Sequence, residues 1–115
     1  MNRSAGFLAL IFVLSIKPVS AQEYVWVSGR GLVDIEPLTC TDIASSSFLR
    51  RVCYDETNRY LLVGLEEKWL HYCETDSSIV RAFIAAPSAA RFYNSNIRSG
   101  PFDCRKKRMP KYDDE

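Results

Sequence analysis

The stretch from Phe48 to Arg98, FLRRVCYDETNRYLLVGLEEKWLHYCETDSSIVRAFIAAPSAARFYNSNIR, decides the fold of this chain. Its first half holds three short runs rich in leucine, β-branched and aromatic residues, at 48–55, 60–65 and 69–73. The polar sequences between the runs, Asp55-Glu56-Thr57-Asn58 and Glu66-Glu67-Lys68, predict hairpin turns, and the Asp and Asn side chains of the first can hydrogen-bond their own backbone. Runs of this length and spacing predict three strands joined as an antiparallel meander.

The alternation of side chains along these strands predicts which of them share a face of the sheet. One face is expected to carry the core side chains Val52, Tyr54, Leu61, Val63 and Leu65. The opposite face of the same two strands is expected to carry Arg51, Cys53, Leu62 and Gly64. On the third strand, Leu70 and Tyr72 share one face, and Trp69, His71 and Cys73 share the other.

Two helices are predicted after the strands. Thr75-Asp76-Ser77 offers an N-cap, because a side-chain oxygen there can accept an unpaired backbone N–H. One apolar stripe follows at helical spacing, formed by Ile79, Val80, Phe83 and Ile84. Pro87 ends this helix, since the residue before a proline avoids helical geometry, and Ser88 caps a second helix. The stripe of that second helix is formed by Ala89, Phe92, Tyr93 and Ile97.

The predicted fold class is therefore α+β. It is a small three-stranded antiparallel meander, plus a strand from an N-terminal extension, packed against one or two C-terminal helices. The extension spans residues 22–45 and contains a β-like run at Tyr24–Val27 and a second short run at 32–35. We expect it to pack along one edge or face of the sheet, tied by Cys40, with residues 41–47 as a polar linker or turn.

The C-terminal part of the chain is expected to fold back after the second helix. Ser99-Gly100-Pro101 ends that helix, and Phe102 and Cys104 are predicted to form a short tied segment. Residues 105–115 form a tail with a basic block followed by an acidic one. We expect this tail to fray past Met109, as chain ends do when nothing holds them.

The first 21 residues have the composition of a secretory signal peptide. Arg3 precedes an apolar run at 5–16, and Val19-Ser20-Ala21 is a small-residue cleavage site before Gln22. A membrane anchor is the alternative, but a span needs about 20 apolar residues, and Lys17-Pro18 interrupts this run. We therefore expect an exported protein, periplasmic or secreted and bacterial, with no membrane span after cleavage.

The charge of the exported part is close to neutral. Removing Arg3 and Lys17 from the 15 basic residues leaves 13, against all 14 acidic residues, so the net charge is −1. Tight binding of nucleic acid relies on a basic excess that releases counterions. The composition therefore argues against a nucleic-acid partner, although it leaves room for a local basic patch.

Four cysteines lie in the exported part: Cys40, Cys53, Cys73 and Cys104. An even number in a small exported protein favours two structural disulfides. The alternative, a redox or metal site, is disfavoured because the chain has no Cys-x-x-Cys pair and the spacings match no zinc pattern. We expect neither a metal nor a cofactor.

Strand geometry narrows the pairing of these cysteines. Cys53 and Cys73 lie on strands that flank the middle strand, about 9.6 Å apart, whereas a disulfide needs Cα atoms within about 7 Å. Both should therefore pair with Cys40 and Cys104 on the face away from the helices. Cys40–Cys53 with Cys73–Cys104 closes the shorter loops and is slightly preferred over Cys40–Cys73 with Cys53–Cys104.

Three strings in the central stretch resemble the KTSC domain, a small domain found at the C-terminus of some lysyl-tRNA synthetases and alone in many bacterial proteins. They are Ser46-Ser47-x-Leu49-x-x-Val52-x-Tyr54-Asp55, then Leu61-x-Val63-x-Leu65, then Ala85-Ala86-Pro87-Ser88-x-x-x-Phe92-Tyr93-Asn94-x-x-Ile97-Arg98. The third string is the most specific. We place the KTSC-like domain at residues 46–104.

The chain departs from the family pattern at three places. The family's Tyr-x-Tyr stands here as Leu70-His71-Tyr72, its Val-Pro before the helix as Thr75-Asp76, and its glycine after Pro-Ser-x as Ala90. The resemblance implies a β-meander with C-terminal helices. It implies no activity, because the family's role is not established and RNA binding has only been suggested.

Catalytic chemistry is not expected. His71 and Cys73 share a strand face, but residues two apart are about 6.6–6.8 Å from each other, too far for a direct nucleophile–base hydrogen bond. A disulfide at Cys73 would also remove the thiolate. The chain has no glycine-rich phosphate loop or nucleophile elbow either, so we predict that it is not an enzyme.

A candidate binding surface is formed by Tyr72, Arg91, Asn94 and Arg98. Asn94 and Arg98 are neighbours on the second helix because they are four residues apart, and they can hold an anion. The structural alternative has Asn94 bonded to loop backbone and Arg98 paired with a carboxylate such as Asp55. Tyr54, Tyr72 and Tyr93 with Arg91 can instead form an aromatic, basic face for single-stranded RNA, or simply pack in the core.

The sequence thus predicts an exported, monomeric, disulfide-stabilised protein with a binding or structural role. An envelope protein or polymer is the expected kind of partner, and the basic block Arg105–Arg108 is available to touch an anionic one. An RNA-binding module is the alternative function.

Overall fold

The three predicted central strands form the middle of the sheet. In the structure, a computed structural model that describes residues 23–112, β4 (Leu49–Asp55), β5 (Tyr60–Leu65) and β6 (Trp69–Tyr72) pair as an antiparallel meander. The expected signal peptide with its cleavage site and the acidic end at 113–115 lie outside the described residues.

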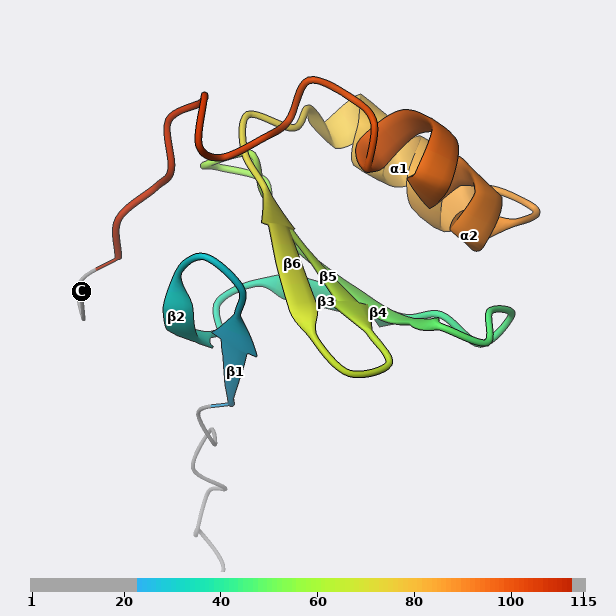
Figure 1. Cartoon of the computed structure of the whole chain (residues 1–115), viewed down its shortest axis with the longest axis horizontal. Helices are drawn as coiled ribbons and strands as arrows, with labels where there is room; N and C mark the ends of the chain where they lie inside the picture. The colour runs from blue at the N-terminus through green and yellow to red at the C-terminus, as the bar shows by residue number, and fades with distance from the viewer. Residues whose placement is uncertain (1–22, 113–115) are drawn as a thin grey trace, which may run out of the picture.

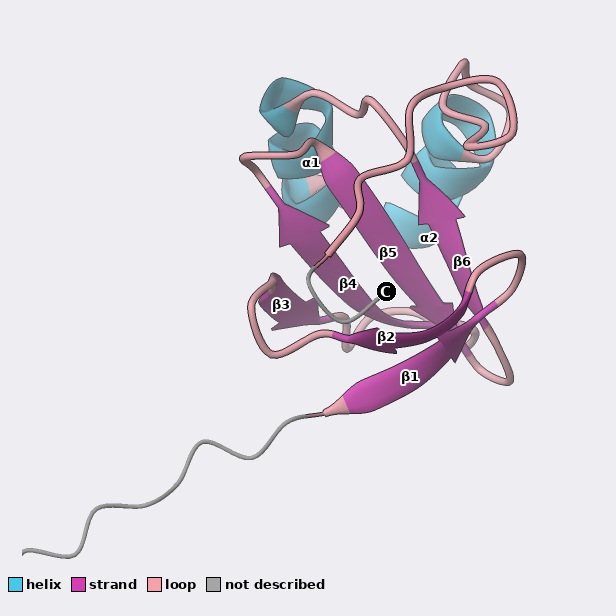
Figure 2. Cartoon of the chain, turned by 90° about the vertical axis from the view of Figure 1, so that its left-hand side faces the viewer, coloured by secondary structure: helices cyan, strands magenta, loops and turns pink. Residues whose placement is uncertain are grey.

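The N-terminal extension adds three strands rather than one. β1 (Tyr24–Val27) and β2 (Gly31–Asp34) form a hairpin next to β6, and β3 (Thr39–Asp42) pairs with β4 at the opposite edge. The strand order is β2-β1-β6-β5-β4-β3. β1 runs parallel to β6, so the six-stranded sheet is mixed and curls into a half-barrel (Figure 2). The expectation of three strands plus one is thereby corrected.

The sequence pattern does not predict β3, whose residues look like the end of the extension and the start of a polar linker. At an exposed edge a strand needs no apolar alternation, since backbone pairing alone holds it beside its neighbour. Here Cys40 lies directly opposite Cys53, and the two form a disulfide across the strands.

Two helices follow the sheet, α1 (Ser77–Ala85) and α2 (Ala89–Phe92), and the chain continues from α2 into a π-helical turn, η2 (Tyr93–Ile97). The Ser88 hydroxyl accepts a hydrogen bond from the backbone N–H of Arg91, as predicted. Asp76 does not cap α1 with its side chain, because its carboxylate pairs with Arg59 at 2.9 Å. Within residues 23–112, no helix is both long and apolar enough to span a bilayer.

The sheet has a buried cluster on each face. α1, α2 and η2 lie together on one side, with the β1–β2 hairpin on the other (Figure 1). The cluster under the helices contains Leu49, Val52, Tyr54, Leu61, Val63, Val80, Phe83, Ala89, Tyr93 and Ile97. The opposite cluster contains Val27, Val33, Ile35, Leu38, Cys53, Tyr60, Leu62 and Cys73. The predicted alternation along β4 and β5 is confirmed, whereas Ile84 of the α1 stripe is 38% exposed.

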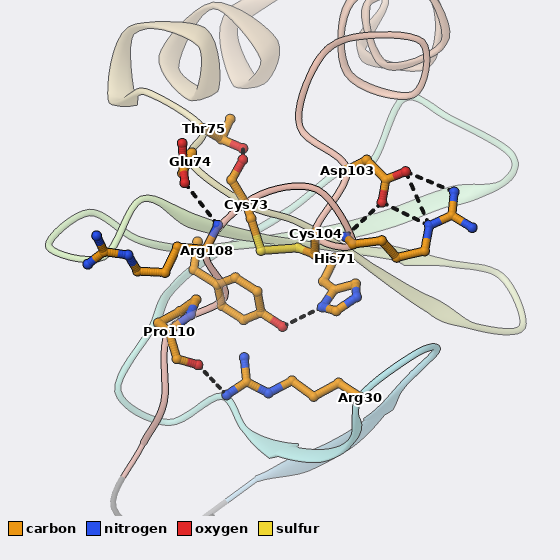
Figure 3. The surroundings of a disulfide bond; sticks show 11 residues. Arg30, His71, Cys73, Glu74, Thr75, Asp103, Cys104, Arg108 and Pro110 are labelled. Atoms are coloured by element: carbon orange, nitrogen blue, oxygen red, sulfur yellow. Dashed lines mark hydrogen bonds and ion pairs between the residues drawn. A yellow bond between two sulfur atoms is a disulfide. The ribbon is translucent and has the colours of Figure 1, made fainter.

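The C-terminal segment covers part of the second cluster. Cys104 is bonded to Cys73, and Tyr112 packs against the cluster while its hydroxyl donates to the Asp55 carboxylate at 2.6 Å. The Arg30 guanidinium lies over the Tyr60 and Tyr112 rings. It donates to the Pro110 carbonyl (Figure 3). Residues 110–112 are therefore held against the sheet, and the expected fraying past Met109 does not occur there.

Candidate binding groove at the edge of strand β6

A groove of about 660 Å³ lies at the outer edge of β6. Its floor is the second half of that strand, and its walls are the β1–β2 turn at Ser28 and Gly29 and the segment that follows η2. Gly29 has a φ of 87°, the left-handed geometry that lets the chain reverse at the wall. A volume of this size is ordinary for a small-ligand site.

The groove exists because β1 and β6 separate. These strands are paired at Val27 opposite Trp69, after which the Ser28 N–H donates to the Trp69 carbonyl at 3.0 Å. Further along, the Cys73 N–H donates to the Phe102 carbonyl at 2.8 Å. Between these two bonds the edge of β6 is covered by no other strand among residues 23–112.

His71 is the residue at the open part of the edge, and its side chain lies on the face of the sheet opposite the helices. The Tyr60 hydroxyl lies 2.8 Å from Nδ1 of His71, and the two rings meet edge to face at 5.8 Å (Figure 3). Burial, and then the charge of Arg30, lower the pKa of His71 below its ordinary 6.5. The imidazole is therefore neutral at neutral pH.

Tyr72 faces the helices. Its hydroxyl lies 2.6 Å from the hydroxyl of Tyr93, with the rings edge to face at 6.0 Å. Burial, followed by this hydrogen bond, raises the pKa of Tyr72. The Tyr72 hydroxyl therefore stays protonated, and the pair fixes the strand against η2 rather than supplying a base.

The groove contains one arginine held by a carboxylate and one that is not. Arg105 donates to Asp103 from Nη2 at 2.8 Å and from Nε, and these bonds lower the pKa of Asp103 to about 2. Arg98 donates from Nη1 to the Asn94 side-chain oxygen at 3.4 Å and forms no ion pair among residues 23–112. Arg98 thus brings a positive charge to the groove that no carboxylate among those residues compensates.

A match to a protein-family model shows which family the chain belongs to. Residues 45–102, half of the chain, match the model of the KTSC domain. The chain belongs to the KTSC domain family. The structure is also similar to the crystal structure of a KTSC domain protein from Yersinia pestis, with a TM-score of 0.52 and 24% identity. That match covers 57% of this chain and 92% of the other, and no curated protein matches the chain.

The family match shows how the groove is assembled. The KTSC domain supplies the floor, Leu70 to Tyr72, and the cation Arg98. The walls at Ser28 and Gly29 and at 103–109 come from segments outside the matched residues. Both cysteines that tie the flanking segments, Cys40 and Cys104, also lie outside the match, while their partners lie within it.

The structure separates the four residues of the predicted binding surface. Tyr72 and Arg98 line the groove, with Asn94 bonded to Arg98 beside it. Arg91 lies in a different hollow, next to Ser88 and Asn96. The suggested pairing of Arg98 with Asp55 is wrong, because the Asp55 carboxylate accepts from Asn58 and Tyr112.

The aromatic face considered for RNA is not assembled as a surface. Tyr93 is 1% exposed and Tyr54 is 8% exposed, with the Tyr54 hydroxyl donating to the Thr75 carbonyl. Rings buried in this way have no free face on which a base can stack. The packing alternative for these tyrosines is the one that the structure shows.

His71 and Cys73, which are not expected to act together, form no nucleophile–base pair, because Cys73 is in a disulfide and the His71 ring contacts Tyr60. Among residues 23–112, no cluster of three or more His, Cys, Asp or Glu side chains is placed to hold a metal ion.

The groove walls are the part of the site that sequence reasoning misses. Asp103 and Arg105 look like parts of a tied segment and a solvated tail, and Ser28 and Gly29 look like an ordinary turn. The useful signal is the cysteine at 104, since a bond to the third strand of the meander brings its neighbours to the edge of β6.

Proposed function

We propose that this KTSC protein is a non-enzymatic binding module of an oxidising compartment, whose groove beside β6 takes an anionic ligand. The observation that carries the proposal is Arg98, a cation without an ion-pair partner among residues 23–112 at the side of a groove of ligand size. A guanidinium there can bind a carboxylate or phosphate through paired, charge-assisted hydrogen bonds.

The chemistry around the groove supports binding rather than catalysis. The ionisable side chains on β6 are His71, whose ring contacts Tyr60, and Tyr72, whose hydroxyl contacts Tyr93. Neither lies beside a free nucleophile, since Cys73 is oxidised. A general base must reach the proton that it takes from a ligand, and the ring nitrogen Nδ1 of His71 is already hydrogen-bonded to the Tyr60 hydroxyl.

Two disulfides support an oxidising compartment, because thiols in the cytoplasm are kept reduced. Together with the apolar N-terminal run, they favour export to the bacterial periplasm or beyond. N-terminal sequencing of the protein from an envelope fraction is expected to start at Gln22. Recovery of the chain with Met1 intact from the cytoplasm would contradict export.

Calorimetric titration tests the binding proposal. The probes are an N-acetyl tripeptide, a phosphate monoester and an acidic oligosaccharide, each offered to the wild type, Arg98→Gln and Arg91→Gln. We expect at least one probe to bind the wild type and Arg91→Gln equally, and to lose its affinity for Arg98→Gln. Arg91→Gln is the matched control, because it removes the same charge outside the groove.

The same variants test the alternative function, which is RNA binding. If single-stranded RNA is retarded in a salt-sensitive way by the wild type and by Arg98→Gln alike, the protein is a nucleic-acid-binding module and the groove is not its site. Equal affinity of every acidic probe for the wild type and for Arg98→Gln also contradicts the proposal.

A further inference from the structure

We infer that the ligand of the groove is the C-terminal end of an extended peptide, which pairs with the backbone of His71 and places its carboxylate at Arg98. This inference rests on the proposed function and names its ligand class. It comes from the way in which the edge of β6 is covered at both ends and left open between them.

Hydrogen-bond alternation sets the direction of the His71 backbone. In an antiparallel pair, successive residues point their N–H and C=O groups alternately toward the partner strand and away from it. The Leu65 N–H donates to the Lys68 carbonyl, so the backbone N–H and C=O groups of Leu70 and Tyr72 also point toward β5. The backbone N–H and C=O groups therefore point to the outer edge at Trp69, His71 and Cys73.

Two observed bonds agree with this alternation. The Trp69 carbonyl accepts from Ser28, and the Cys73 N–H donates to Phe102, both across the outer edge. His71 lies between them and has no backbone hydrogen-bond partner at that edge among residues 23–112. Its N–H and C=O open onto the groove, where an extended backbone can satisfy both.

The dimensions favour the end of a peptide over a passing strand. From Trp69 to Cys73 the strand rises about 13 Å, and both ends of that interval are closed by the bonds to Ser28 and Phe102. A strand that ran through would collide with these segments. A chain end of two or three residues fits, because only His71 is open for pairing within this interval.

The charge of the groove determines which end of the peptide binds there. Arg98 has no carboxylate partner among residues 23–112, whereas Asp103 is occupied by Arg105. A terminal carboxylate is therefore attracted and a terminal ammonium is repelled. The groove also contains Leu70 and Met109, which offer apolar contact to the last side chain of the peptide. Capture of an extended segment along a strand edge is a known mode of peptide recognition.

NMR titration of the ¹⁵N-labelled chain with defined peptides tests the inference. The probe is a mixture of N-acetyl tripeptides with randomised side chains and a free carboxylate. Two matched mixtures carry a C-terminal amide, or an N-methyl group on the last residue that removes the donor to the His71 carbonyl. We expect the His71 amide signal to move with the first mixture, and the apparent affinity to fall about tenfold or more with either of the others.

Two variants test whether Arg98 binds the terminal carboxylate. Arg98→Gln should lose the preference for the free carboxylate over the amide, and Arg91→Gln should keep it. If acetate or inorganic phosphate shifts signals around Arg98 as strongly as the peptides do while the His71 amide stays in place, the peptide inference is overturned and an anion groove remains. If no acidic probe moves any groove signal, the proposed function fails as well.

Discussion

Phe83 illustrates, at the scale of single residues, how the helical side of the sheet is packed. Its side chain is fully buried, and its ring stacks on Phe92 at 5.9 Å and on Tyr93 at 6.1 Å. Spacing alone predicts this burial, since Phe83 follows Ile79 and Val80 on one helical stripe. The same stripe predicts burial for Ile84, which lies at its border and is 38% exposed.

Phe83→Ala is expected to lower the free energy of unfolding by about 3–5 kcal/mol, the usual cost of removing a buried aromatic ring. Urea unfolding followed by circular dichroism measures the loss. Ile84→Ala on the same helix is the control and should cost far less. A loss below about 1 kcal/mol for Phe83→Ala would contradict the packing of α1 against the sheet.

His71 gives the protein a pH-dependent stability. Because its pKa in the folded state is lowered from 6.5, first by burial and then by Arg30, the unfolded chain binds more protons at this residue than the folded one. The stability that depends on the neutral ring is complete above pH 6.5 and is lost as the pH falls through the lowered pKa. Once the ring is protonated, Nδ1 can only donate, so its bond to the Tyr60 hydroxyl then requires that oxygen to accept.

His71→Asn is expected to flatten the pH dependence of unfolding. Asparagine keeps an acceptor near the position of Nδ1 but does not titrate. The difference in urea midpoint between the wild type and the variant should therefore shrink between about pH 7.5 and about pH 5. If that difference grows as the pH falls, the fold stabilises the charged imidazole and the pKa of His71 is raised rather than lowered.

At the scale of elements, the disulfides determine how the flanking segments meet the sheet. Cys53 and Cys73 are expected on the face away from the helices, and both are fully buried there. The slightly preferred pairing, Cys40 with Cys53 and Cys73 with Cys104, is confirmed. It follows from local alternation and strand spacing, which are properties that a sequence carries.

Removing either disulfide is expected to cost about 2–5 kcal/mol. The loss should be larger for Cys73→Ser with Cys104→Ser than for Cys40→Ser with Cys53→Ser, because the sequence separation is 31 rather than 13 residues. Chemical unfolding of the two double variants measures this order. Non-reducing peptide mapping of the wild type should show only these two pairs; a Cys53–Cys73 peptide would contradict the strand order.

At the scale of the whole molecule, the features that the sequence predicts are local ones. The strands of the meander have alternating apolar residues, and the helices have a proline and a capping serine between them, so their positions can be deduced. β3 cannot, because it is an exposed edge strand held by pairing and by Cys40. The packing of Tyr112 against the sheet cannot be predicted from the sequence, because its neighbours at 105–111 are mostly basic.

The groove can be predicted only in part, for the same physical reason. The polar side of the second helix and the third strand of the meander point to Arg98 and Tyr72. The walls come from Ser28 and from residues beyond 102, which are distant in sequence and meet only after the flanking segments fold around the KTSC domain. The open backbone of His71 depends on where β1 leaves β6, which no local pattern specifies.

Hydrogen–deuterium exchange of the ligand-free protein, read at single amides by NMR, tests most directly whether the edge of β6 is closed at Trp69 and Cys73 and open at His71. We expect rapid exchange at the His71 amide. Protection is expected at Leu70 and Tyr72, which bond to β5, and at Cys73, which bonds to Phe102. Protection of His71 equal to that of these neighbours would contradict the open edge and the groove built on it.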